Sequence, residues 1–129
     1  TWNQLKEMQA NGFAIGSHTI YHSDLTSPKE GESEQEHVAR IKKELNGSKK
    51  IIDQKLSQNT SFLAYPFGYY DQRSIQMAKE AGYKLAMSVK RGGNPFFANP
   101  LTLRRDQILK KDMQSFVSRL KTFNHLLLK

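Results

Sequence analysis

Residues 61–89 read SFLAYPFGYYDQRSIQMAKEAGYKLAMSV, a stretch in which a strand, a helix and a second strand follow one another. The apolar run at 61–65 is typical of a short buried strand, and it ends at a proline and a glycine. Asp71 predicts the N-cap of a helix that runs to Ala81, where a glycine ends it, and 84–89 is the next strand. Two strands joined by a helix pair in parallel through a right-handed crossover. The stretch therefore predicts an α/β fold.

The alternation of helices and strands extends to both sides of this stretch. Before it come a helix at the start of the chain, a short buried strand at 13–16 and a long helix at 34–56. After it come a candidate fourth strand at 101–105 and a final amphipathic helix. The long helix is predicted from one apolar stripe, formed by Val38, Ile41, Leu45, Ile52 and Leu56. The final helix is predicted from a second stripe, formed by Met113, Phe116, Val117, Leu120 and Phe123. We find no repeat and no second domain, and expect one partial domain over residues 1–129.

The composition excludes a membrane-spanning chain and cysteine chemistry. No window of about 18 apolar residues could span a membrane, and the chain has no cysteine, so a metal would be held by histidine and carboxylate. Lys and Arg number 20 against 12 Asp and Glu, and the net charge of +8 would favour anionic partners. The lysines are scattered along helices rather than interleaved with aromatic residues. We therefore expect a solvated basic surface and no nucleic acid partner.

Two of the four histidines, His18 and His22, lie four residues apart where the strand at 13–16 ends. Two imidazoles at this spacing can point the same way if the chain turns helically between them, and neutral imidazole is the commonest protein ligand for zinc. In parallel sheets functional groups gather at the carboxyl ends of strands. The histidine loop and the loop that follows the strand at 61–65 both fall at such ends, so we expect them to share a cleft.

Several short motifs occur in a specific order along the first 90 residues. They are LKEM at 5–8, NGF at 11–13, IGSHT at 15–19 followed by His22, LT at 25–26, FLAYPFG at 62–68 and AGY at 81–83. In this order and spacing the chain resembles the polysaccharide deacetylases of carbohydrate esterase family four. Less specifically, it is similar to the branch that acts on poly-N-acetylglucosamine.

The resemblance implies a deformed (β/α) barrel in which an aspartate and two histidines bind a divalent metal, usually Zn²⁺. The two histidines fall on His18 and His22. A metal polarises the acetamide carbonyl and lowers the pKa of a bound water toward about 7, while a carboxylate takes the proton of that water. The family's oxyanion donor includes a backbone N–H in the loop matched at 65–68. Here it falls on Phe67, because Pro66 has no N–H.

The chain departs from the family pattern in three places. The paired aspartates that supply the base and the third ligand belong upstream of the histidines, where this chain has no aspartate. Ala64 occupies the place of an arginine that orients the base, and Arg105 is the candidate substitute. A late Leu-His motif is not evident, because His125 precedes a leucine, and a surface or packing role fits it better.

The missing aspartates and the abrupt start at Thr1 predict a partial barrel that lacks its first strand or two. We expect the isolated chain to be inactive. Open sheet edges would have to be covered, so self-association is an expected behaviour. Any targeting signal would lie outside this chain.

Other residues have both a functional and an ordinary reading. Tyr65, Tyr69 and Tyr70 could bind a sugar, since aromatic faces pack on pyranose rings, or could simply pack in the fold. For Phe96 and Phe97, a structural role in a capping loop and a role in substrate contact are equally expected. His37, which lies among glutamates on the long helix, is predicted to be solvated.

Three hypotheses follow for function. The favoured one is metal-dependent removal of N-acetyl groups from an N-acetylglucosamine polysaccharide at the cell surface, by an extracellular enzyme. The main alternative is a noncatalytic carbohydrate-binding or scaffold remnant of the same fold. The third is a basic module that docks on an anionic wall polymer or nucleic acid, with the histidines incidental.

Overall fold

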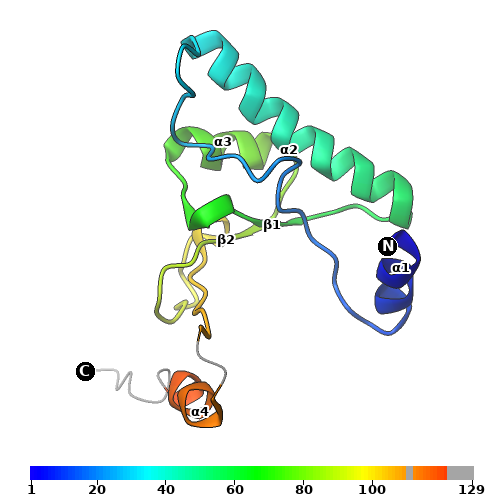
Figure 1. Cartoon of the computed structure of the whole chain (residues 1–129), viewed down its shortest axis with the longest axis vertical. Coiled ribbons are helices and arrows are strands. Elements are labelled where there is room, and N and C mark those ends of the chain that lie inside the picture. Colours follow the sequence, from blue (N-terminus) through cyan, green and yellow to red (C-terminus); the bar gives the residue numbers. More distant parts are fainter. Residues whose placement is uncertain (110–111, 122–129) are drawn as a thin grey trace.

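The computed structural model describes residues 1–109 and 112–121 of the chain (Figure 1). The elements, in chain order, are the helix α1 (Trp2–Ala10), the helix α2 (Glu34–Leu56), the strand β1 (Phe62–Ala64), the 3-10 helix η1 (Pro66–Gly68), the helix α3 (Gln72–Glu80), the strand β2 (Leu85–Met87), the 3-10 helix η2 (Pro100–Thr102) and the helix α4 (Met113–Lys121). In this part of the chain no helix is both long and apolar enough to cross a membrane.

The predicted strand, helix and strand of residues 61–89 are present as β1, α3 and β2. The two strands pair in parallel with Leu63 opposite Ala86, and α3 forms the crossover (Figure 1). Asp71 caps α3 as expected, because its carboxylate accepts a hydrogen bond of 2.7 Å from the backbone N–H of Ser74. The α/β prediction is confirmed.

The outer strands of the prediction are shorter than expected. The segment at 13–16 forms no strand, and only Ser17 bridges β1, in parallel at Leu63. It was predicted to be buried, yet Phe13 is 58% exposed. Among the described residues, no segment pairs with Ser17 on the side away from β1. This edge of the sheet is therefore open.

The candidate strand at 101–105 is likewise reduced to one parallel bridge, between Met87 and Leu103. Its first residues form η2 instead. Pro100 favours the first turn of a helix, and the Asn99 side chain caps that turn by accepting from the backbone N–H of Leu101 at 2.9 Å. The sheet thus has β1 and β2 at its centre, with Ser17 bridged to β1 on one side and Leu103 bridged to β2 on the other. All of these pairings are parallel.

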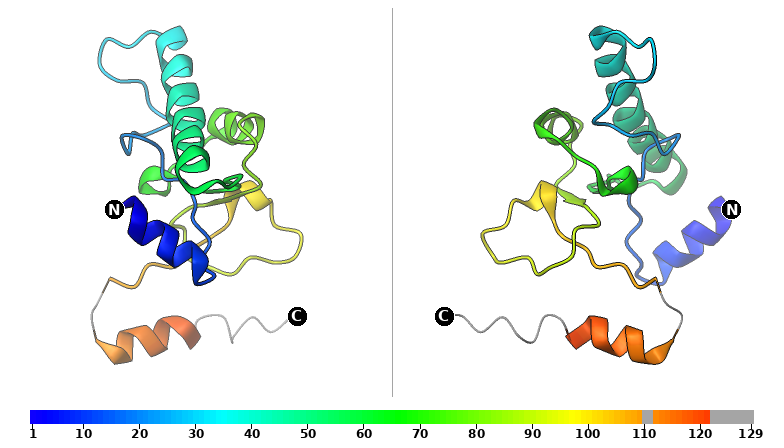
Figure 2. Two further views of the ribbon diagram at one scale, coloured as in Figure 1. Left: turned by 90° about the vertical axis from the view of Figure 1, so that its right-hand side faces the viewer. Right: turned by 60° about the vertical axis from the view of Figure 1, so that its left-hand side comes forward.

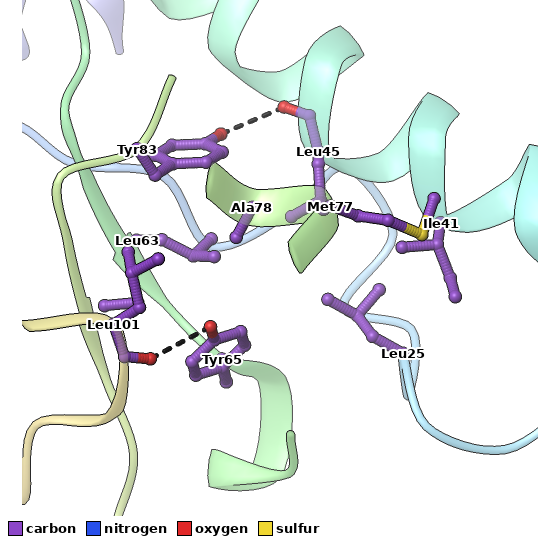
Figure 3. Close-up of a cluster of buried hydrophobic side chains, with 10 residues drawn as sticks. Leu25, Ile41, Leu45, Leu63, Tyr65, Met77, Ala78, Tyr83 and Leu101 are labelled. Atoms are coloured by element: carbon purple, nitrogen blue, oxygen red, sulfur yellow. Dashed lines mark hydrogen bonds between the residues drawn. The ribbon is translucent and has the colours of Figure 1, made fainter. Parts of the chain in front are cut away.

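The hydrophobic core lies between the sheet and the helices α2 and α3 (Figures 1 and 3). Leu63 and Ala86 are fully buried on this side, while their strand neighbours are half-buried. From α2, the predicted stripe contributes Ile41 and Leu45 to the core. The hydroxyl of Tyr83 donates to the backbone carbonyl of Leu45 at 2.9 Å, which ties the entry of β2 to the helix.

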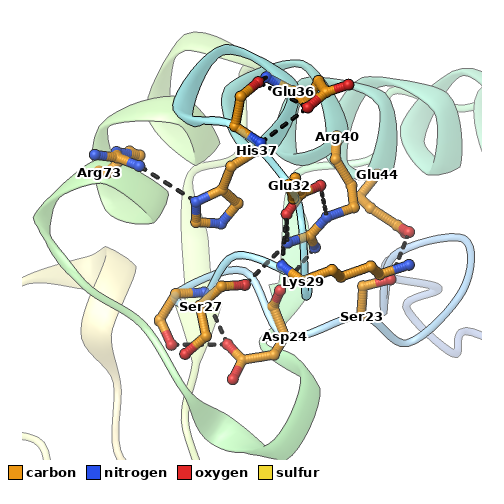
Figure 4. Close-up of polar contacts among 12 residues, drawn as sticks. Ser23, Asp24, Ser27, Lys29, Glu32, Glu36, His37, Arg40, Glu44 and Arg73 are labelled. Atoms are coloured by element: carbon orange, nitrogen blue, oxygen red, sulfur yellow. Dashed lines mark hydrogen bonds and ion pairs between the residues drawn. The ribbon is translucent and has the colours of Figure 1, made fainter.

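His37 is 1% exposed, so the prediction that it is solvated is wrong. The loop that precedes α2 folds back over the helix and covers this residue (Figure 4). Arg40 holds that loop down, since its guanidinium donates to the Asp24 carbonyl at 2.9 Å and pairs with Glu32 at 2.7 Å. Helical periodicity reports which face meets the sheet but not which residues a loop covers.

The two terminal helices contribute little to the core, and α4 lies apart from the other helices (Figure 2). α1 is present as predicted and begins at a Thr1 capping box, but it has no buried residue. α4 exposes the apolar side chains of its predicted stripe between Met113 and Leu120. The rest of that stripe, Phe123, and the predicted surface residue His125 lie outside the described residues.

Candidate functional site

The predicted site residues gather where parallel segments of the sheet end. His18 follows the bridged Ser17, the 65–68 loop follows β1, and Arg105 lies just beyond the bridged Leu103. A groove of about 570 Å³ runs along the open face of the sheet and is lined by both His18 and Arg105. Two loops and an arginine that are far apart in sequence therefore meet at one edge.

His18 and His22 lie together as the sequence predicts. Their ring centroids are 4.7 Å apart and the rings are nearly perpendicular, with an interplanar angle of 77°. The Nδ1 of His18 lies 2.7 Å from the carbonyl oxygen of Ala64, and this hydrogen bond requires Nδ1–H to donate. The lone pair of His18 is then on Nε2, the arrangement that second-shell carbonyls impose on metal-ligating imidazoles.

The chain brings the two imidazoles together without a helical turn between them. Thr19 and His22 adopt positive φ angles of 66° and 55°, values that non-glycine residues rarely take. Such conformations cost on the order of 1–3 kcal/mol each and persist only where surrounding contacts impose them. The two imidazoles are therefore brought together by a strained turn.

One of the contacts that impose this turn is the carboxylate of Glu44, on α2, which sequence reasoning missed. It is 2% exposed and accepts hydrogen bonds from the loop. Burial by itself would raise the pKa of the Glu44 carboxyl, but the hydrogen bonds from Tyr21, Ser23 and Ile20 outweigh it, so the pKa lies below its usual value. A glutamate among core positions of α2 was the only signal of this role in the sequence.

Phe67 brings the second loop against the histidines. Its ring packs edge-on against His22 with centroids 4.5 Å apart. Its backbone has a positive φ of 56°. The N–H groups of Gly68 and Tyr69 close turn hydrogen bonds, whereas that of Phe67 donates to no acceptor in the described part of the chain. Phe67 therefore contacts His22 through its ring and carries a backbone N–H that has no acceptor among the described residues.

The chain can make this turn because of the glycine that follows Phe67. Gly68 has a φ of +73°, and a Cβ placed on it would lie 2.5 Å from the backbone nitrogen of Val89. The loop thus passes directly against the end of β2, where only glycine fits.

Arg105 is exposed at the rim of the groove. Among the residues that the structure describes, no carboxylate pairs with its guanidinium, whereas the neighbouring Asp106 pairs with Arg119 at 3.0 Å. A cationic group thus faces the same groove as His18 without an anionic partner of its own.

The three predicted tyrosines differ in exposure. Tyr65 is fully buried, and its hydroxyl donates to the Leu101 carbonyl at 3.1 Å (Figure 3). Burial raises the pKa of this phenol, and no face of the ring is open to a sugar, so we do not carry its predicted substrate role further. Tyr69 is 56% exposed beside Phe67, and Tyr70 lines a shallow hollow with it.

The site brings together the two side chains that the sequence offers as candidate metal ligands, His18 and His22. Within residues 1–109 and 112–121, no three His, Cys, Asp or Glu side chains are gathered closely enough to hold a metal ion. The donor set nevertheless fits a zinc site in part, because Zn²⁺ favours imidazole nitrogens as ligands and a backbone carbonyl fixes the orientation of the His18 ring.

The chain matches the family model described as polysaccharide deacetylase over residues 1–86. It is 32% identical over 94 residues to YxkH of Bacillus subtilis (strain 168), a protein named as a polysaccharide deacetylase, and the match covers 71% of this chain and 30% of YxkH. Metal dependence is general among deacetylases of this family.

Solved structures show the same fold. The deacetylase PplD of Streptococcus pyogenes, in complex with acetate, superposes with a TM-score of 0.78 at 29% identity, covering 92% of this chain and 50% of PplD. The deacetylase domain of BpsB from Bordetella bronchiseptica superposes with a TM-score of 0.76 at 21% identity, covering 82% of this chain and 48% of that one.

The chain spans 30% of YxkH and about half of PplD and of the BpsB domain, and its fold is a part of their (β/α) barrel. The motifs, the parallel sheet and the match over residues 1–86 agree with one another. The chain belongs to the polysaccharide deacetylase family.

Proposed function

We propose that the complete protein carrying this chain is a metal-dependent hydrolase that removes N-acetyl groups from an N-acetylglucosamine polysaccharide. The chain would supply a single partial domain to that enzyme. The observation that carries the proposal is the contact of His18, His22 and the Phe67 loop at the carboxyl edge of the sheet. Membership of the deacetylase family supports it.

In this proposal His18 and His22 hold a divalent metal, and Zn²⁺ suits their nitrogen donors best. When bound, such a metal polarises the acetamide carbonyl and lowers the pKa of water. The Ala64 carbonyl keeps a proton on Nδ1 of His18, so that its Nε2 faces outward with a lone pair. We propose that the third ligand and the catalytic base are aspartates in the part of the domain that this chain does not span.

The other residues assist the reaction from this chain. The Phe67 N–H, which has no acceptor among the described residues, would donate to the oxyanion formed from the acetamide. The Arg105 guanidinium, which pairs with no carboxylate among the described residues, would orient the base, in the role that Ala64 cannot fill. Tyr69 and Tyr70 would pack on sugar rings beside the loop. A polymeric substrate of this kind places the enzyme outside the cell or at its surface.

Replacement of either histidine tests the proposal. In the complete protein, His18→Ala and His22→Ala should each abolish zinc binding and acetate release from an N-acetylglucosamine oligomer. His125→Ala is the matched control, because it removes a histidine that the proposal does not use. Unchanged acetate release in the His18 and His22 variants would sink the proposal. Glycan binding without acetate release by the unaltered protein would favour a carbohydrate-binding remnant instead.

A further inference from the structure

Glu44 is a buried carboxylate whose hydrogen-bond partners all come from the histidine loop. One oxygen accepts from the backbone N–H groups of Ile20 and Tyr21, at 2.7 and 3.0 Å. The other accepts from the hydroxyl of Ser23 at 2.9 Å (Figure 4). No Lys or Arg forms an ion pair with it in the described part of the chain. A buried charge is costly unless hydrogen bonds satisfy it, so the loop and the carboxylate require one another.

The two histidines are held by different means. The His18 ring is fixed directly, through its hydrogen bond to the Ala64 carbonyl. The His22 ring has only ring contacts, to His18 and Phe67, and no side-chain hydrogen bond among the described residues. Its position therefore depends on the backbone around it.

The residues on both sides of His22 are held by the same carboxylate, Tyr21 through its backbone N–H and Ser23 through its side-chain hydroxyl. Tyr21 precedes His22 and Ser23 follows it, and both donate to Glu44. Between them His22 has a φ of 55°, which an unanchored loop would relax. Glu44 lies on α2, a 23-residue helix whose core face packs on α3, so its carboxylate projects from an element held by the hydrophobic core.

We propose that Glu44 is a positioning residue for His22 in the metal pair. The inference rests on the proposed metal role of the two histidines. Glu44 would touch neither metal nor substrate, and would act by holding the strained turn that keeps the His22 ring beside that of His18.

The test measures zinc affinity of the complete protein by competition with a chromophoric chelator. Outer partners of metal ligands typically contribute about 10-fold to 100-fold in affinity, and we expect Glu44→Ala to weaken zinc binding by at least about 10-fold. Glu44→Gln keeps the shape of the side chain and one carbonyl acceptor, but its hydrogen bonds lose their charge assistance, so we expect about a fivefold loss. Glu34→Gln is the matched control, because it removes the same charge from the exposed end of the same helix and should leave the zinc affinity unchanged.

A second readout separates positioning from general stability. Imidazole NMR signals of metal-free Glu44→Gln should shift for His22 and stay constant for His18, which the Ala64 carbonyl holds. If Glu44→Ala does not fold, the folded Gln variant decides by both measurements. The inference would be overturned if the zinc affinity of folded Glu44→Gln were within twofold of that of the unaltered protein. It would also be overturned if the imidazole signals of His18 and His22 shifted equally in that variant. If His18→Ala and His22→Ala themselves leave zinc affinity unchanged, the proposed metal site fails instead.

Discussion

The clearest test of the site's construction is the pair of substitutions Gly68→Ala and Gly31→Ala. Both glycines have nearly the same left-handed backbone, with φ angles of +73° and +75°. A Cβ on Gly68 would lie 2.5 Å from Val89 backbone and side-chain atoms, whereas one on Gly31 would meet nothing within 4 Å. The two substitutions therefore carry the same backbone penalty, and they differ only in the close approach of the new Cβ to Val89 at position 68.

The magnitudes follow from these two terms. A left-handed conformation costs an alanine about 1–2 kcal/mol, which is the whole effect expected at Gly31. Overpacking against a fixed backbone adds about 1–3 kcal/mol, so Gly68→Ala should lose about 2–5 kcal/mol of unfolding free energy. Relief of the clash would also move the Phe67 N–H away from the histidines, so acetate release should fall in this variant alone.

Urea denaturation of the complete protein and its two variants measures the difference. The reasoning requires Gly68→Ala to be less stable than Gly31→Ala by at least about 1 kcal/mol. Equal losses in the two variants would show that the close approach to Val89 has no energetic weight.

Four further results are expected. Hydrogen bonding to Arg40 lowers the pKa of Glu32 to about 2. The stability from this pair is therefore complete above the ordinary glutamate pKa of 4.5 and is lost as the pH falls from there toward about 2. Across this pH range the midpoints of urea unfolding should fall less steeply in Glu32→Gln than in the unaltered protein. Tyr83→Phe removes the 2.9 Å hydrogen bond to the buried Leu45 carbonyl, which keeps the Ser48 hydroxyl as a donor at 3.1 Å. The substitution should therefore cost about 0.5–1.5 kcal/mol of unfolding free energy, with zinc affinity as the unchanged control. Arg105→Ala should lower kcat for acetate release while zinc affinity stays constant, and a normal kcat would remove Arg105 from the proposal. The 129-residue chain by itself should release no acetate and should associate through the apolar groove. Its mass measured by light scattering should therefore rise with protein concentration. A monomeric mass at every concentration would contradict the expected association.

The helices were predictable because their signals are local. Asp71 caps α3 within four residues of itself, and the stripe of α2 repeats with the period of the helix. The strands were less predictable, because a strand forms only where a neighbour pairs with it. The segments at 13–16 and 101–105 have strand-like sequences, yet the first has no pairing before the bridge at Ser17, and the second has a single bridge at Leu103.

The sequence by itself determined the α/β order, the histidine pair and the membership of the family, because caps, periodicity and motif spacing are properties of neighbouring residues. Only the tertiary structure decided which polar residues are buried. It placed His37 beneath a loop and Glu44 against the backbone around His22, and it closed the Tyr65 ring inside the core. These outcomes depend on contacts between residues in different segments, such as the hydrogen bond from Tyr21 to Glu44, which are 23 positions apart. Such contacts depend on the path of the loop, which no local pattern encodes.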